Sequence, residues 1–170
     1  MNGVVEKLKT IFANWHQSVA EWHFFSMAQA NVGADNWTKP AILVESPTLG
    51  EFFLYSRRIK DRPRLRIWAL CRQANGDSNR YDTEAQVEEM KILLCKYLVC
   101  INESGLFERI EQNVGISYIY AVNYLDSGLC GVGVDLYLKE RVASVNLCDF
   151  DPTTDPDEEE EQEPGNNENP

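Results

Sequence analysis

The first part of the chain carries apolar residues at three- and four-residue steps, the spacing that places side chains on one face of a helix. The stripe consists of Val4, Leu8, Ile11, Phe12, Trp15 and Val19. The pattern predicts an amphipathic helix from about Gly3 to Glu21. The next segment, residues 22–27, fits either a short strand or the end of this helix.

Two further runs have the pattern of strands. The apolar run between Pro40 and Pro47 is short, and prolines mark places where ladder pairing stops. From Arg64 to Arg72 the side chains alternate, as in a longer strand with one face toward a core. The aromatic-rich segment 49–59 leads to Asp-Arg-Pro at residues 61–63, where we predict a turn. We expect the longer strand to pair with the shorter one.

A second helical stripe predicts a long helix that Asp82 or Thr83 caps. Its buried side is expected to consist of Val87, Met90, Leu94, Tyr97, Leu98 and Ile101. The helix is expected to end near Asn102, and a short helical segment is expected at residues 106–112.

The last third of the chain has a β pattern. Residues 116–125 are rich in β-formers, residues 129–142 alternate, and a turn signal separates them. We therefore predict a hairpin. Gly131 and Gly133 lie on the face opposite Val132 and its apolar neighbours, so the first part of that face carries almost no side chains.

The element order helix, two or three strands, helix and hairpin predicts the α+β class. We expect a mixed or antiparallel sheet of four to five strands, with two main helices packed on one face. This domain is assigned to residues 1–148. It contains no apolar run approaching the roughly 20 residues of a membrane-spanning helix, so no membrane partner is expected.

Charge separates the end of the chain from the rest. Residues 149–170 contain ten acidic side chains, no Lys or Arg and four prolines. Removing these ten from the chain's 27 acidic residues leaves 17, against 16 Lys and Arg. This segment therefore carries -10 of the formal net charge of -11. With one aromatic residue and no aliphatic residue, it is predicted to be a disordered acidic tail.

The chain lacks the residue combinations of common catalytic, metal and cofactor sites. His16 and His23 are its only imidazoles, no G-x-S-x-G elbow occurs, and none of the five cysteines forms a C-x-x-C pair. The glycine pattern at residues 128–133 runs into a strand instead of a helix, so we interpret it as a crowded hairpin and not as a phosphate loop. We expect no enzyme activity, catalytic residue, cofactor or metal.

One basic cluster stands out as a candidate interface. It consists of Arg57, Arg58, Lys60, Arg62, Arg64 and Arg66, with Trp68 next to it. Three interpretations remain open: contacts to nucleic-acid phosphates, solvated charges that protect a sheet edge, or a docking patch for an acidic surface. Of these three interpretations, contact with nucleic acid is the least favoured.

The chain resembles the tail-terminator and head–tail joining proteins of tailed bacteriophages, of the prophage type from gut bacteria. The matching parts are the first helical stripe, PAILVE (40–45), RPRLRIWALC (62–71), TEAQVEEMKILLCKYL (83–98) and SYIYAVNYLDSGLCGVGVDLYL (117–138). Together they extend over roughly residues 1–142, and the likeness lies in element order and length.

The resemblance implies a non-enzymatic subunit of a ring that terminates the tail tube or joins it to the neck. The partners would be further copies of the chain and tail-tube or neck proteins, in the virion and, during assembly, in the cytoplasm of the bacterial host. The arginine-rich hairpin would form a subunit or tube contact. The alternative function is an intracellular interaction or regulatory module that binds an acidic partner or nucleic acid through residues 57–66.

Overall fold

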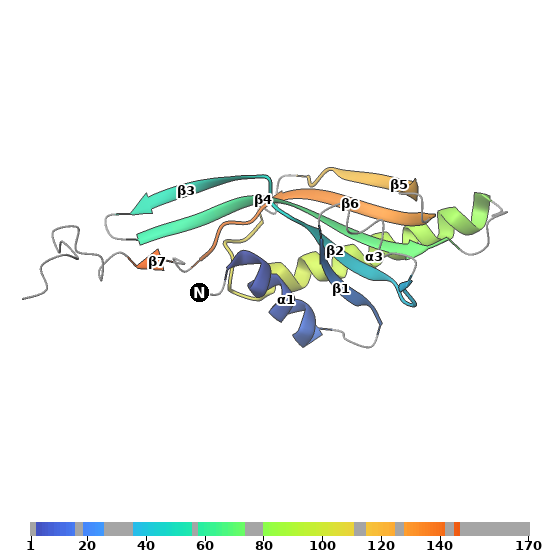
Figure 1. Cartoon of the computed structure of the whole chain (residues 1–170), viewed down its shortest axis with the longest axis horizontal. Helices are drawn as coiled ribbons and strands as arrows, with labels where there is room; N and C mark the ends of the chain where they lie inside the picture. Colours follow the sequence, from blue (N-terminus) through green and yellow to red (C-terminus); the bar gives the residue numbers. More distant parts are fainter. Residues whose placement is uncertain are drawn as a thin grey trace, which may run out of the picture.

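The structure, a computed structural model, describes residues 3–15, 19–25, 36–55, 58–73, 80–110, 115–124, 128–141 and 145–146. The elements in chain order (Figure 1) are α1 (Val4–Trp15), β1 (Glu21–Phe25), β2 (Ala41–Glu45), β3 (Leu49–Tyr55), β4 (Arg58–Arg72), α3 (Arg80–Glu103), β5 (Tyr118–Tyr124), β6 (Leu129–Tyr137) and β7 (Val145–Asn146).

The described strands form one mixed sheet. Its main path runs β1–β2–β4–β6–β5, and β3 and β7 pair with β4 off this path. β1 and β2 are parallel, whereas the other ladders are antiparallel. The predicted α+β class and mixed sheet are confirmed. The sheet has seven strands where four to five were expected, because β3 and β7 pair with the first half of β4.

The 15-residue strand β4 organises the sheet. Its second half, from Arg64 onward, lies between β2 and β6. Its first half pairs with β3 on one side and with β7 on the other. The hairpin of β3 and residues 58–64 of β4, here called the arm, projects beyond the ends of both helices (Figure 1).

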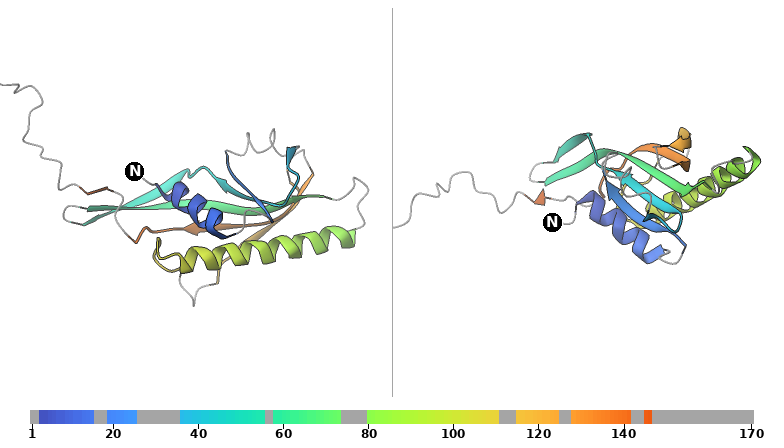
Figure 2. Two further views of the ribbon diagram at one scale, coloured as in Figure 1. Left: turned by 90° about the horizontal axis from the view of Figure 1, so that it is seen from below. Right: turned by 45° about the vertical axis from the view of Figure 1, so that its right-hand side comes forward.

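Helices α1 and α3 cover the same face of the sheet, as predicted (Figure 2). The core between them contains Leu8 and Phe12 of α1, Leu94 and Tyr97 of α3, and Ile67 of β4. The buried Tyr97 hydroxyl donates a 2.8 Å hydrogen bond to the carbonyl of Leu8 and so joins the two helices.

A smaller core lies on the opposite face, around Trp68 and Leu43. Trp68 pairs in register with Gly133, where an added Cβ would lie 2.3 Å from the indole ring. At Gly131 a Cβ would lie 2.0 Å from the carbonyl oxygen of Ala69. The prediction that glycines occupy crowded sheet positions is confirmed, because the indole fills the space beside Gly133 and the β4 backbone fills the space beside Gly131.

The predicted turn at residues 61–63 is wrong, because these residues lie inside β4. Pro63 fits there because its carbonyl accepts a hydrogen bond from the backbone N–H of Leu138 at 3.3 Å. Because proline has no backbone N–H, the only hydrogen bond missing at this position is the one that residue 63 would donate back to residue 138. The chain reverses instead between Tyr55 and Arg58.

Two helix predictions are also corrected. The first helix ends at Trp15 and the chain enters β1 at Glu21, so the strand interpretation is confirmed as far as Phe25. The segment after α3 is not helical over residues 106–110. The backbone N–H of Glu108 donates to the carbonyl of Lys139 at 2.8 Å, so pairing with a strand replaces helical hydrogen bonds.

Two predictions concern the limits of the domain. The predicted tail from Asp149 onward lies outside the described residues, as does the boundary at residue 148. Neither described helix is long and apolar enough to cross a membrane.

Candidate functional site

The alternation of β4 brings most of the predicted basic cluster onto one face. Lys60, Arg62, Arg64 and Arg66 are two residues apart in a single strand, so their side chains leave the sheet on the same side. Arg57 and the side chain of Arg58 lie outside the described residues.

Asp135 of β6 joins two of these arginines. Arg66 donates from Nε and Nη2 to the two carboxylate oxygens, at 2.7 and 3.0 Å, and Arg64 donates from Nη2 at 3.1 Å. The hydrogen bonds from Arg66, together with those from Arg64, lower the pKa of Asp135 despite its partial burial. This forked pairing fixes the register of β4 against β6.

The remaining cations of the cluster also have carboxylate partners. Arg62 pairs with Glu51 of β3 at 3.2 Å. Lys60 and Lys139 each lie 3.2 Å from Glu108. Burial alone would raise the pKa of Glu108, but hydrogen bonds from the two lysines lower it.

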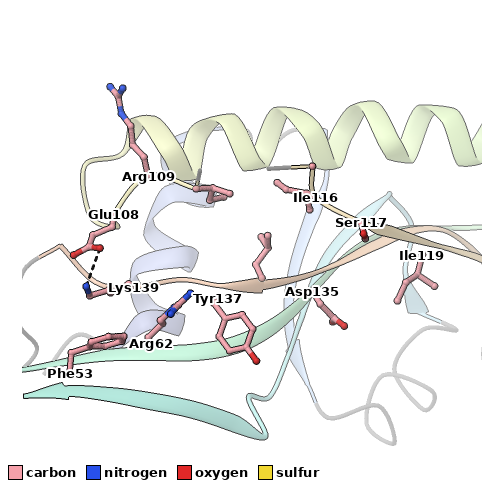
Figure 3. Close-up of a pocket in the computed structure, with 13 residues that line it drawn as sticks. Phe53, Arg62, Glu108, Arg109, Ile116, Ser117, Ile119, Asp135, Tyr137 and Lys139 are labelled. Carbon is pink, nitrogen blue, oxygen red and sulfur yellow. Dashed lines mark ion pairs between the residues drawn. The ribbon is translucent and has the colours of Figure 1, made fainter. Parts of the chain in front are cut away.

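A groove of about 590 Å³ opens beside these pairs, between the end of β6, the arm and the segment before β5 (Figure 3). The Arg62 guanidinium lies 5.1 Å from the ring of Tyr137 and 5.9 Å from that of Phe53. The Lys139 ammonium lies 4.3 Å from the Phe53 ring. Figure 3 shows the guanidinium of Arg109 pointing away from this group.

The edge-protecting interpretation is wrong, because β4 is paired along both of its sides. The contacts support paired charges on the surface of the sheet instead. Each described cation of the cluster binds a carboxylate of the same chain, and cations engaged in this way offer less charge to phosphates. Among the described residues, no group of three or more His, Cys, Asp or Glu side chains is placed to hold a metal ion.

The prediction that Trp68 belongs to a surface interface is wrong, because this side chain is buried. Its side chain is 1 % exposed, and its indole N–H donates to the Glu45 carboxylate. Alternation places it on the face of the arginines, but the second core covers that part of the face.

The described histidine and the cysteines of β4 and β6 contact neighbouring side chains of the fold. His23 stacks on Trp37 with 4.7 Å between ring centroids and lies 3.2 Å from Glu21, whereas His16 lies outside the described residues. Cys71 and Cys130 face each other across β4 and β6 with 3.6 Å between their sulfur atoms. The contact with Cys130 raises the pKa of Cys71, and the same contact lowers the pKa of Cys130.

The arm carries an apolar surface that sequence reasoning missed. Phe52 and Leu54 of β3 are 74 % and 75 % exposed, and Leu49 at its start is also exposed. Isolated exposed apolar residues are ordinary, but neighbouring ones on a projecting hairpin indicate an interaction site. The available signal was the run Phe52-Phe53-Leu54-Tyr55, in which apolar residues occupy both strand faces.

A second apolar surface lies on the outer side of α3. Ile92 and Val99 are 54 % and 53 % exposed and border a shallow groove of about 490 Å³. The surface continues onto β5, where Tyr118 and Tyr120 are exposed and Lys91 of α3 lies 5.1 Å from the Tyr118 ring. The predicted stripe of the helix covered only its opposite, buried side.

Comparison with protein-family models, with curated proteins and with solved structures finds no match for this chain.

Proposed function

We propose that the chain is a non-enzymatic assembly protein of a tailed bacteriophage, and that its copies form a ring that terminates the tail tube or joins it to the neck. The ring contact involves the arm and the outer side of α3. The basic cluster has a structural part in this proposal, since it holds the arm and β6 together.

The observation that carries the proposal is the presence of two unlike apolar surfaces on one chain. Phe52 and Leu54 project on a hairpin, whereas Ile92 and Val99 border a shallow groove on a helix. Unlike surfaces that meet between copies form a head-to-tail contact, which repeats and closes into a ring if the rotation between subunits permits.

The size of the surfaces favours a closed ring over an isolated pair. Because these four side chains are already partly covered in the monomer, burying the rest of them contributes on the order of 4–8 kcal/mol. The loss of translational and rotational freedom on association costs about as much. A single contact is therefore weak. In a ring every copy makes two contacts, which stabilises the closed form over the open pair.

The phage assignment rests on element order. The described part of the chain contains a first helix, paired strands, a long helix and a closing hairpin, in the order of the tail-terminator and head–tail joining proteins. The alternative module would bind an acidic partner or nucleic acid through the basic cluster. It receives less support because carboxylates of the chain itself engage those cations.

Negative-stain electron microscopy of the purified full chain tests the proposal. Closed rings of uniform diameter are expected. Open filaments or irregular aggregates would contradict ring closure. Reversing the charge of Arg64 and Arg66 is a poor companion test, because it would place three carboxylates together and disturb the fold at Asp135.

A further inference from the structure

We infer that the arm of one copy docks in the groove on the outer side of α3 of a second copy, with Phe52 and Leu54 as the inserted side chains. The inference rests on the proposed ring, since it names the two surfaces that meet in it. The partner is therefore a second copy of this chain.

The inserted side is a defined face of the arm. Phe52 and Leu54 are two residues apart in β3 and point to the same side. Their cross-strand partners on this face are Asp61 and Ile59. The face thus has an apolar centre with one carboxylate toward the base of the arm.

The receiving groove has matching chemistry. Ile92, Cys95 and Val99 follow each other along one side of α3, and Trp15 of α1 contributes to the lining. Lys96 lines the same groove, as does Lys91, which forms a 3.3 Å ion pair with Glu88. An apolar floor with Lys96 beside it suits a ligand that brings an aromatic and an aliphatic side chain with a nearby carboxylate.

The arm does not reach the groove of its own chain. Its two strands pair continuously from Leu49–Arg64 to Tyr55–Arg58, which keeps the hairpin extended. In the views of Figures 1 and 2 the arm extends away from the middle of α3, where Ile92 lies. The contact must therefore form between two copies.

One arm and one groove per copy give the assembly a direction. Each copy donates its arm to one neighbour and receives the arm of another. A two-fold symmetric dimer would instead make two reciprocal arm–groove contacts and stop at two copies. The mass of the wild type separates the two geometries, because head-to-tail contacts continue beyond two copies.

The test uses two double variants of the full chain. The arm variant carries Phe52→Thr and Leu54→Thr, because an aspartate at residue 52 would lie directly across from Asp61. The groove variant carries Ile92→Asp and Val99→Asp. Val19→Asp is the matched control, because Val19 is 51 % exposed and lies on neither surface. All five positions are exposed, so thermal unfolding of each variant is expected to stay close to that of the wild type.

Mass is measured by light scattering for each protein and for an equimolar mixture of the two double variants. Each double variant alone is expected at the monomer mass of 19.4 kDa. The mixture can make one contact, because the groove variant keeps an intact arm and the arm variant keeps an intact groove. Since a single contact is weak, the mean mass of the mixture is expected to rise above that of either variant alone as the concentration increases, toward twice the monomer mass. The control should assemble as the wild type does.

The outcomes separate the two proposals. If the wild type forms rings and either double variant still does so, the arm–groove contact is wrong and the ring stands. If both double variants are monomeric and their mixture stays monomeric, the two surfaces do not bind each other. If the wild type is itself monomeric, both the ring and the inference fail.

Discussion

At the scale of single residues, the contact between Gly133 and Trp68 shows how the sheet accommodates a large side chain on a crowded face. The indole is almost fully buried and rests where a side chain on β6 would stand. Sequence alternation placed Trp68 on this face, and the glycine is what allows it to lie flat there.

Replacement of Gly133 by alanine is expected to destabilise the fold by about 1–3 kcal/mol, because the new methyl group overlaps a ring that has no room to move. Urea unfolding measures the difference. Gly115→Ala is the matched control, since an added Cβ there has no neighbour within 4 Å. Equal stability of the two variants would contradict the proposed packing.

At the scale of elements, an ion pair attaches α1 to the strand segment after β6. The ammonium of Lys7 bonds the carboxylate of Glu140, whose side chain is fully buried. Glu140 also raises the pKa of Asp61, after the larger effect of that residue's own burial. A buried carboxylate needs compensation, so this pair determines where α1 can lie.

Lys7→Met is expected to cost about 3 kcal/mol, the low end for a broken buried pair, because Glu140 has further interactions. Lys9→Met on the same helix is the control, since Lys9 is exposed. Chemical denaturation of both variants gives the comparison. A loss no larger for Lys7→Met than for Lys9→Met would show that the pair does not hold α1.

The forked pair of Asp135 with Arg66 and Arg64 predicts a pH dependence. Because the pKa of Asp135 in the folded protein lies below its ordinary value of 3.8, the pair stabilises the fold above about pH 4. This contribution is lost as the pH falls through the lowered pKa. The Asp135→Asn variant lacks it at every pH.

The free energy of unfolding of wild type and Asp135→Asn is therefore compared at pH 6 and at pH 3 or below. The wild type is expected to be more stable at pH 6, and the difference is expected to shrink in acid. A difference that stays constant or grows in acid would refute a charged, paired Asp135.

Local patterns predicted the elements where periodicity was strong. The α3 stripe, the β5–β6 hairpin and the alternation of β4 all appear in the structure. The turn at residues 61–63 was mispredicted because Pro63 gives a local turn signal, while its tolerance in β4 depends on Leu138, far along the chain. The end of α1 was similarly decided by the pairing of β1 with β2.

The candidate site was predictable only in part, because it too depends on contacts between residues far apart in the sequence. Spacing placed Arg62, Arg64 and Arg66 on one face, but Asp135 lies about 70 residues further along the chain and gave no local signal. The exposed pair on the arm depends on where the helices end, which is a property of the assembled sheet.

At the scale of the whole molecule, the sheet separates the exposed apolar residues of the arm from those on the outer side of α3. The paired charges along β4 keep the arm aligned with the body. A monomer exposes both sets of apolar side chains to water, and self-association would cover them.

The mass of the full chain in solution, measured by light scattering over a series of concentrations, tests this claim most directly. As the concentration increases, we expect the monomer of 19.4 kDa to give way to one larger species of fixed mass, a whole multiple of the chain, without a dominant dimer between them. A mass that stays at 19.4 kDa up to the solubility limit would contradict it.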